Sequence, residues 1–115
     1  MESDLLFALV QKQEWKEYSA SGKLNTPDLK EKGYLIVYEG KNTEKAANTL
    51  FPEEQDLFML IIDPLRIQHP IKKEKTEYGE ELHILGSISI DAVIDRILIK
   101  RNKKGNFSIG IKHFD

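Results

Sequence analysis

Two side chains suited to proton transfer or to hydrogen bonding with a ligand, Glu74 and His83, lie in the segment from residue 74 to residue 86. Imidazole changes its charge near neutral pH, so His83 can donate a hydrogen bond or act as a general acid or base. A carboxylate at Glu74 that points inward among apolar side chains needs a partner, and His83 is the natural one. We therefore take His83 and Glu74 as candidate catalytic and ligand-binding residues.

Both residues also have a simpler structural interpretation. His83 lies between Leu82 and Ile84, and a histidine at the rim of a core commonly bonds to the backbone through one ring nitrogen. Glu74 stands among lysines, where a strand edge of mixed charge is solvated and resists aggregation. The polar residues between the two candidates are interpreted as a surface turn: Glu77, Tyr78, Glu80 and Glu81.

Other constellations are weaker. Trp15, Tyr34 and Tyr38 could stack on a base or a nicotinamide ring, although the helical register of Trp15 favours a place in the core. No metal site is expected, because the three histidines show no ligand spacing: His69, His83 and His113. The one compact basic cluster lies at an expected hairpin tip, where lysines are usually solvated: Lys100, Arg101, Lys103 and Lys104.

Length and composition limit the classes of protein that fit. At 115 residues we expect a single domain, residues 1–115, and 40% hydrophobic with 31% charged residues predicts a folded, soluble chain. A net charge of -2 argues against nucleic-acid binding. No segment approaches the about 20 apolar residues of a membrane span. Without cysteine there is no disulfide or thiolate nucleophile, and we expect a cytoplasmic protein.

The elements that must position these residues follow from hydrophobic patterning. Apolar or alternating runs predict strands over residues 5–10, 34–38, 57–62, 71–75 and 82–85, and a hairpin over 93–101 and 106–111. Val93, Ile97 and Ile99 are expected to share one face of the first arm of this hairpin. Helical spacing predicts one helix over 12–21 and a second that is capped by Asn42. Residues 21–33 have little periodicity and are expected to form a long loop. The fold class is therefore α+β, mostly antiparallel, with two short helices in the N-terminal half.

The order of the segments resembles the small bacterial family called domain of unknown function 952. The resemblance runs from about Leu5 to Phe107, and it is carried by the order and spacing of four pieces. These are an opening strand followed by Glu14-Trp15, then Gly33-Tyr34-Leu35-Ile36, then Asp56-Leu57 up to Asp63, and finally Leu82-His83-Ile84-Leu85-Gly86 through Ala92-Val93.

This resemblance implies a fold similar to the ADP-ribosyltransferases, in which a nicotinamide dinucleotide lies in a cleft of a split or strongly curved β-sheet. His83 and Glu74 match family positions, and Tyr38, Tyr34, His83 and Glu74 are the implied cofactor-binding residues for NAD or an ADP-ribose-like ligand. Tyr38 falls on a position that is usually small and polar, so we expect it to line the pocket. Several polar residues of the family pattern are replaced by apolar ones: Ala8, Ile36 and Leu85.

Three hypotheses about function follow from these replacements. Transfer of ADP-ribose needs a carboxylate and hydrogen-bond donors that bind the phosphates. A cleft that has lost polar groups is therefore expected to bind a nucleotide-like or other small ligand without catalysis. An alternative is a protein-interaction module whose cleft is filled by Ile36 and Leu85 and which works through its surface. The second alternative is active ADP-ribose transfer, with His83 and Glu74 as the catalytic candidates.

Overall fold

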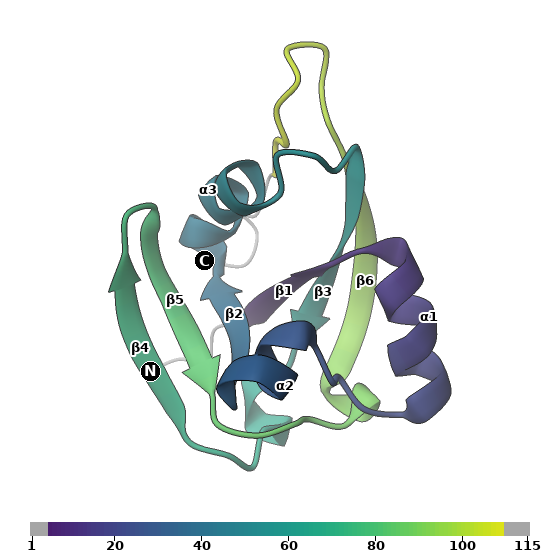
Figure 1. Ribbon diagram of the computed structural model, residues 1–115, viewed down its shortest axis with the longest axis vertical. Helices are drawn as coiled ribbons and strands as arrows, with labels where there is room; N and C mark the ends of the chain where they lie inside the picture. The colour runs from purple at the N-terminus through teal and green to yellow at the C-terminus, as the bar shows by residue number, and fades with distance from the viewer. Residues whose placement is uncertain (1–4, 110–115) are drawn as a thin grey trace.

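Six strands form one antiparallel sheet in the computed structural model, which describes residues 5–109 (Figure 1). The strands lie in the order β4-β5-β2-β1-β3-β6. Every ladder between neighbouring strands is antiparallel, as the α+β class predicts. Their bounds are β1 Leu6–Val10, β2 Leu35–Glu39, β3 Asp56–Ile62, β4 Ile71–Thr76, β5 Gly79–Ile84 and β6 Val93–Lys100.

The sheet opens between β1 and β2. Their ladder contains only two residue pairs, Leu6 with Glu39 and Phe7 with Tyr38. Beyond these pairs β1 continues to follow β3 over its whole length, while β2 turns away and pairs with β5. In Figure 1 the β4–β5 ribbon accordingly stands apart from β1, β3 and β6, with β2 between them. The result is a sheet whose two halves are joined over a short junction.

Three α-helices pack on the sheet in the described part of the chain, one more than the two expected from the sequence. They are α1 Lys12–Ser21, α2 Pro27–Lys32 and α3 Gly40–Leu50, with 3₁₀ turns η1 at Pro64–Arg66 and η2 at Ile90–Ala92. None of the helices within residues 5–109 is long and apolar enough to cross a membrane.

Helix α2 lies inside the segment that was expected to be a loop. The Thr26 hydroxyl accepts a hydrogen bond from the Leu29 backbone at 3.3 Å and thereby caps the first turn. Pro27 occupies the first turn, where its missing N–H costs nothing, and Gly33 ends the helix with a φ of 87°. These start and stop residues outweigh the lack of periodicity in so short a segment.

Helix α3 begins three residues earlier than expected. Its N-cap is Glu39, so Asn42 is an interior residue rather than the cap. The Asn42 side-chain nitrogen is buried without a hydrogen-bond partner among the described residues. Ala46 and Ala47 are completely buried, and their small side chains allow α3 to lie close to the sheet.

Each face of the sheet carries its own core, because successive side chains of a strand point to opposite faces. The first core lies on the α1 and α2 side and includes Ala8, Val10, Leu35, Val37, Leu82 and Ile84. The second lies on the α3 side and includes Phe7, Leu9, Tyr38, Ala46, Ala47 and Tyr78.

The C-terminal hairpin is only partly formed in the described residues. Its first arm is β6, and the second is represented by one bridge between Arg101 and Phe107, since residues 110 and 111 lie outside the described part. A bulge between Val93 and Asp95 puts Val93 against the first core, whereas Ile99 belongs to the second. The expectation that Val93 and Ile99 share one face is therefore wrong.

Candidate functional site

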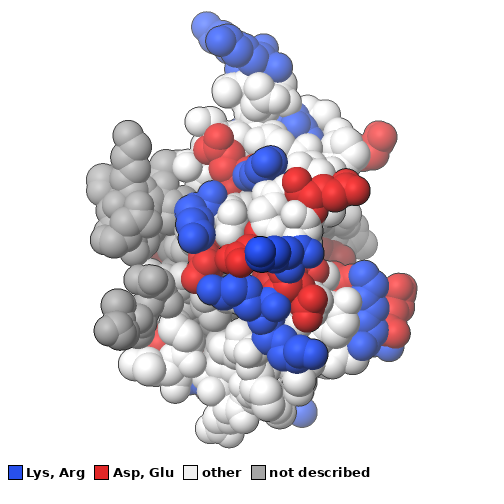
Figure 2. Space-filling view, turned by 90° about the vertical axis from the view of Figure 1, so that its left-hand side faces the viewer, with Lys and Arg blue, Asp and Glu red and all other residues white. Residues whose placement is uncertain are grey.

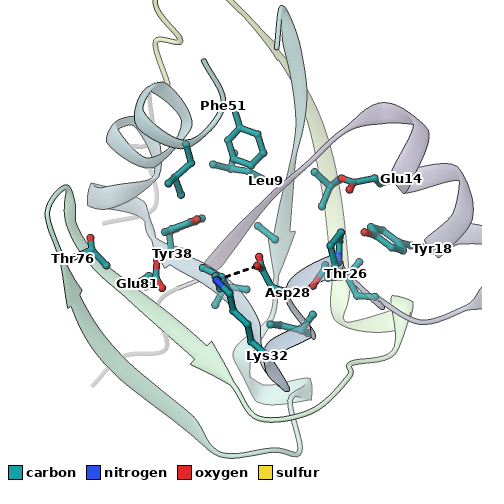
Figure 3. Close-up of a pocket in the computed structure, with 18 of the residues that line it drawn as sticks. Leu9, Glu14, Tyr18, Thr26, Asp28, Lys32, Tyr38, Phe51, Thr76 and Glu81 are labelled. Atoms are coloured by element: carbon teal, nitrogen blue, oxygen red, sulfur yellow. Dashed lines mark ion pairs between the residues drawn. The ribbon is translucent and has the colours of Figure 1, made fainter. Parts of the chain in front are cut away.

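A crevice of about 440 Å³ lies where the sheet opens (Figure 3). If the β1–β2 ladder continued, Ala8 would face Val37, Leu9 would face Ile36 and Val10 would face Leu35. Instead, all of these residues line the crevice. The separation of the two strands thus creates the cavity, and both strands form its floor.

The walls of the crevice come from the helices and from the β4–β5 hairpin. On the α1 and α2 side they include Glu14, Tyr18, Thr26, Asp28 and Lys32, and on the α3 side they include Phe51, Thr76, Tyr38, Tyr78 and Glu81. Figure 3 shows the ion pair between Asp28 and Lys32, at 3.6 Å, between these two groups. Both of its side chains are about half exposed, so the pair lies at the mouth of the crevice.

One carboxylate in the wall, Glu81, joins two polar side chains. The Tyr78 hydroxyl donates a hydrogen bond to one Glu81 oxygen, and His83 Nε2 lies 2.6 Å from the other. Because a carboxylate only accepts hydrogen bonds, the His83 ring nitrogen is the donor. The Glu81 and His83 side chains are each only 12% exposed, so their pairing is shielded from water.

The imidazole of His83 is covered by a second aromatic ring. The rings of Tyr34 and His83 stack with their centroids 3.9 Å apart and an interplanar angle of 10°. His83 pairs directly with Ile36 in the β2–β5 ladder, so it lies on the same face of the sheet as Ile36 and Tyr38. The two-residue period of β5 puts Glu81 on this face as well.

The tyrosine hydroxyls around the crevice are held in their neutral form. Burial raises the pKa of Tyr38 well above its usual range, and a hydrogen bond to Tyr78 adds to this effect. Burial, reinforced by the hydrogen bond to Glu81, raises the pKa of Tyr78 to about 12. Burial and then the nearby Glu14 raise the pKa of Tyr18. At physiological pH these hydroxyls are therefore donors as well as acceptors.

The structure brings together some of the candidates predicted from the sequence. Tyr38 lines the crevice, and Tyr34 and His83 stack on each other beside it without being lining residues. The Glu74 side chain is exposed on β4, directly opposite Glu81 in the β4–β5 ladder. The partner of His83 is therefore Glu81, in place of the Glu74 that the sequence suggested.

The sequence predicts that Glu81 and Tyr78 lie in a surface turn, yet Tyr78 is only 8% exposed. A signal for them exists in the sequence. Leu82 and Ile84 alternate with Glu81 and His83, which predicts a strand with one apolar face and one face that carries a paired acid and base. The turn itself consists of residues 77 and 78, and β5 already begins at residue 79.

Charged clusters elsewhere have structural partners or are mixed in sign. Arg101 of the basic cluster donates hydrogen bonds to the carbonyl groups of Phe51, Glu54 and Gly105, and its guanidinium lies 4.3 Å from the Phe107 ring centroid. On the face that carries β4, Figure 2 shows acidic and basic side chains interspersed. No group of three or more acidic or histidine side chains that could hold a metal ion occurs within residues 5–109. His113 lies outside this range.

Two of the remaining sequence candidates, Trp15 and Leu85, do not form part of the crevice. The Trp15 ring packs against the first core and lies 5.5 Å from the guanidinium of Arg96. Leu85, expected to fill the cleft, is 39% exposed and is not a lining residue, whereas Ile36 is. The cleft is therefore open.

Comparisons with known proteins agree on the family and the fold. A family model described as "Protein of unknown function (DUF952)" matches residues 9–96. The crystal structure of protein CC0527 from Caulobacter crescentus is 15% identical, with a TM-score of 0.79 over 90% of this chain and 93% of that chain. A solution NMR structure of CC0527 has 16% identity and a TM-score of 0.74, over 89% and 90% of the two chains. A search of curated proteins found no match.

Proposed function

The chain belongs to the DUF952 family, and on this premise we propose that it is a ligand-binding domain that holds a small molecule in the crevice between β1 and β2. The observation that carries the proposal is the early end of the β1–β2 ladder, which leaves a cavity of about 440 Å³. Cavities that hold small molecules usually measure about 300–1,000 Å³.

The lining has the composition of a ligand site. Apolar side chains such as Leu9, Ile36 and Phe51 can bury the body of a ligand, while Tyr38 and Glu81 offer polar groups that fix its orientation. The separated lengths of β1 and β2 also have no strand partner across the gap. Backbone N–H and C=O groups that face this gap need hydrogen-bond partners, which water or a ligand supplies.

Binding without catalysis fits the arrangement of the candidate acid and base. His83 is covered by Tyr34 and is not a lining residue, so a ligand in the crevice does not contact its imidazole. Glu81 does line the crevice, but its two oxygens already accept from Tyr78 and His83. A carboxylate whose position is fixed by two hydrogen bonds is suited to recognising a ligand by its charge.

The open crevice also favours ligand binding over a protein-interaction module with a filled cleft. The interaction-module hypothesis requires the side chains of Ile36 and Leu85 to fill the cleft, but Leu85 lies outside the crevice. A sheet that opens around a ligand is also what an ADP-ribosyltransferase-like fold would provide, so nucleotides belong among the ligands to test. Active transfer would release nicotinamide from the dinucleotide, and incubation with several acceptors measures this directly.

The test of the proposal is a thermal-shift panel of 2-phenylethanol, nicotinamide, AMP and ADP-ribose. A bound ligand at about 100 times its dissociation constant stabilises the fold by about 2.7 kcal/mol. The variant Ile36→Trp should abolish the shift by filling the crevice. Ile97→Trp is the matched control, because Ile97 is an exposed strand residue on β6 and not part of the lining. If no compound shifts the wild-type melting temperature, or if Ile36→Trp shifts equally, the proposal fails.

A further inference from the structure

The charged side chains of the crevice are unbalanced. Three carboxylates line it, Glu14, Asp28 and Glu81, against one ammonium group, Lys32. No arginine occurs among the described lining residues. Lys32 is already paired with Asp28, at 3.6 Å, so two carboxylates have no cationic partner within the lining. The lining side chains therefore carry a net negative charge and produce a negative field in the crevice.

The helix ends at the crevice do not offset this field. The N-terminus of α2 begins with Pro27, which has no N–H, and the Thr26 cap already accepts from Leu29. Asp28 adds a negative charge in the same turn. At the start of α1, the Glu14 carboxylate accepts a hydrogen bond from the Gln11 backbone at 2.9 Å. Neither end offers the free cluster of N–H donors that a phosphate group requires.

Two aromatic rings lie beside the Glu81 carboxylate in the wall. Tyr38 and Tyr78 are 4% and 8% exposed, and their rings meet edge to face with centroids 6.4 Å apart, next to Glu81. The faces of such rings attract cations, and a nearby carboxylate strengthens that attraction where water is partly excluded. Glu81 retains acceptor capacity, because a carboxylate offers about four lone-pair sites and two are used.

We propose that the crevice selects a cationic ligand, an amine carried on an apolar or aromatic body, and discriminates against ligands that carry phosphate or carboxylate groups. This inference rests on the proposed function, because it names the chemical class of the molecule held between β1 and β2. The ammonium group is placed against Glu81 and the tyrosine rings, and the apolar body lies on Leu9, Ile36 and Phe51.

Three probes of similar size and different charge separate this inference from the proposed function. They are 2-phenylethylamine, 2-phenylethanol and 3-phenylpropanoate, each titrated into the full chain and followed by NMR shifts of lining residues. We expect the amine to bind about tenfold more tightly than the alcohol, and the carboxylate to bind more weakly than both. If the alcohol binds and the amine has no advantage, the charge selection is refuted while the crevice remains a binding site. If none of the three binds, both proposals fail.

The variant Glu81→Gln tests the residue that carries the selection. It keeps the shape of the side chain and removes its charge, so the amine should lose its roughly tenfold advantage over the alcohol when both are titrated into the same variant. Glu80→Gln is the matched control: Glu80 is the neighbouring strand residue, does not line the crevice and faces Lys73, at 3.9 Å. Loss of amine binding in both variants, or in neither, would overturn the assignment to Glu81. Unfolding curves of both variants confirm that they are folded.

Discussion

Removing one oxygen atom, by the change Tyr78→Phe, tests whether the hydrogen bonds around Glu81 stabilise the fold. The Tyr78 hydroxyl donates to Glu81, and the Tyr78 side chain is 8% exposed. A hydrogen bond to a charged group contributes about 1.5–3 kcal/mol, and Tyr78→Phe removes this bond from a buried position. We therefore expect the free energy of unfolding to fall by about 2–3 kcal/mol.

The assay is urea denaturation at pH 7, with Tyr34→Phe as the matched control. Tyr34 contributes its ring to the stack on His83, and no hydrogen bond among residues 5–109 uses its hydroxyl. Its replacement should change the free energy of unfolding by less than about 0.5 kcal/mol. If Tyr78→Phe also stays within this limit, the hydrogen bonds around Glu81 do not contribute to stability and the reasoning is refuted.

The pH dependence gives an independent check on the same group. The pKa of Tyr78 is raised to about 12 in the folded chain, against 10.0 for an unperturbed tyrosine. The folded state therefore holds this proton more tightly than the unfolded state. The contribution of Tyr78 to the free energy of unfolding is fully present below pH 10 and is lost as the pH rises towards 12. The loss should be smaller in Tyr78→Phe but not absent, because burial also raises the pKa of Tyr38. An equal loss in wild type and variant would contradict the assignment.

Two further predictions concern residues outside the hydrogen bonds around Glu81. Gly79→Ala should lower the free energy of unfolding by about 1–3 kcal/mol, because φ is 126° and the new Cβ would lie 2.7 Å from a side-chain oxygen of α3. The control is Gly105→Ala, where φ is 85° and no atom lies within 4 Å of the new Cβ. It should cost clearly less in the same thermal denaturation. Arg101→Met should cost about 2 kcal/mol by removing three hydrogen bonds, to the carbonyl groups of Phe51, Glu54 and Gly105. The exposed Lys103→Met should be neutral. Equal effects within either pair would contradict the structural roles given to Gly79 and Arg101.

Patterns local to one segment could be predicted from the sequence, and contacts between segments could not. The buried strands and α1 follow from apolar runs and helical spacing. Helix α2 was missed because the sequence signals it through two capping residues and a proline rather than through a helical repeat of apolar residues. The true start of α3 was missed because Asn42, a good cap by type, lies inside the helix.

The candidate site was predictable in position but not in composition. The segment that contains His83 does border the crevice, and Tyr38 lines it. The choice between Glu74 and Glu81 depends on which strand lies at the edge of the sheet. Glu74 belongs to the edge strand β4, where its side chain is exposed, and Glu81 belongs to β5, whose neighbours on both sides shield it. That order of strands is a property of the whole fold, which no single segment reveals.

The short junction between β1 and β2 also has a mechanical consequence. The strands β4, β5 and β2 form one twisted ribbon and β1, β3 and β6 form another, and only two ladder pairs connect them. Side chains of both ribbons pack together in each of the two cores, so packing holds the ribbons against each other where the ladder between β1 and β2 has ended. The same feature that creates the cavity thus leaves the two halves of the sheet joined mainly by side-chain packing rather than by backbone hydrogen bonds.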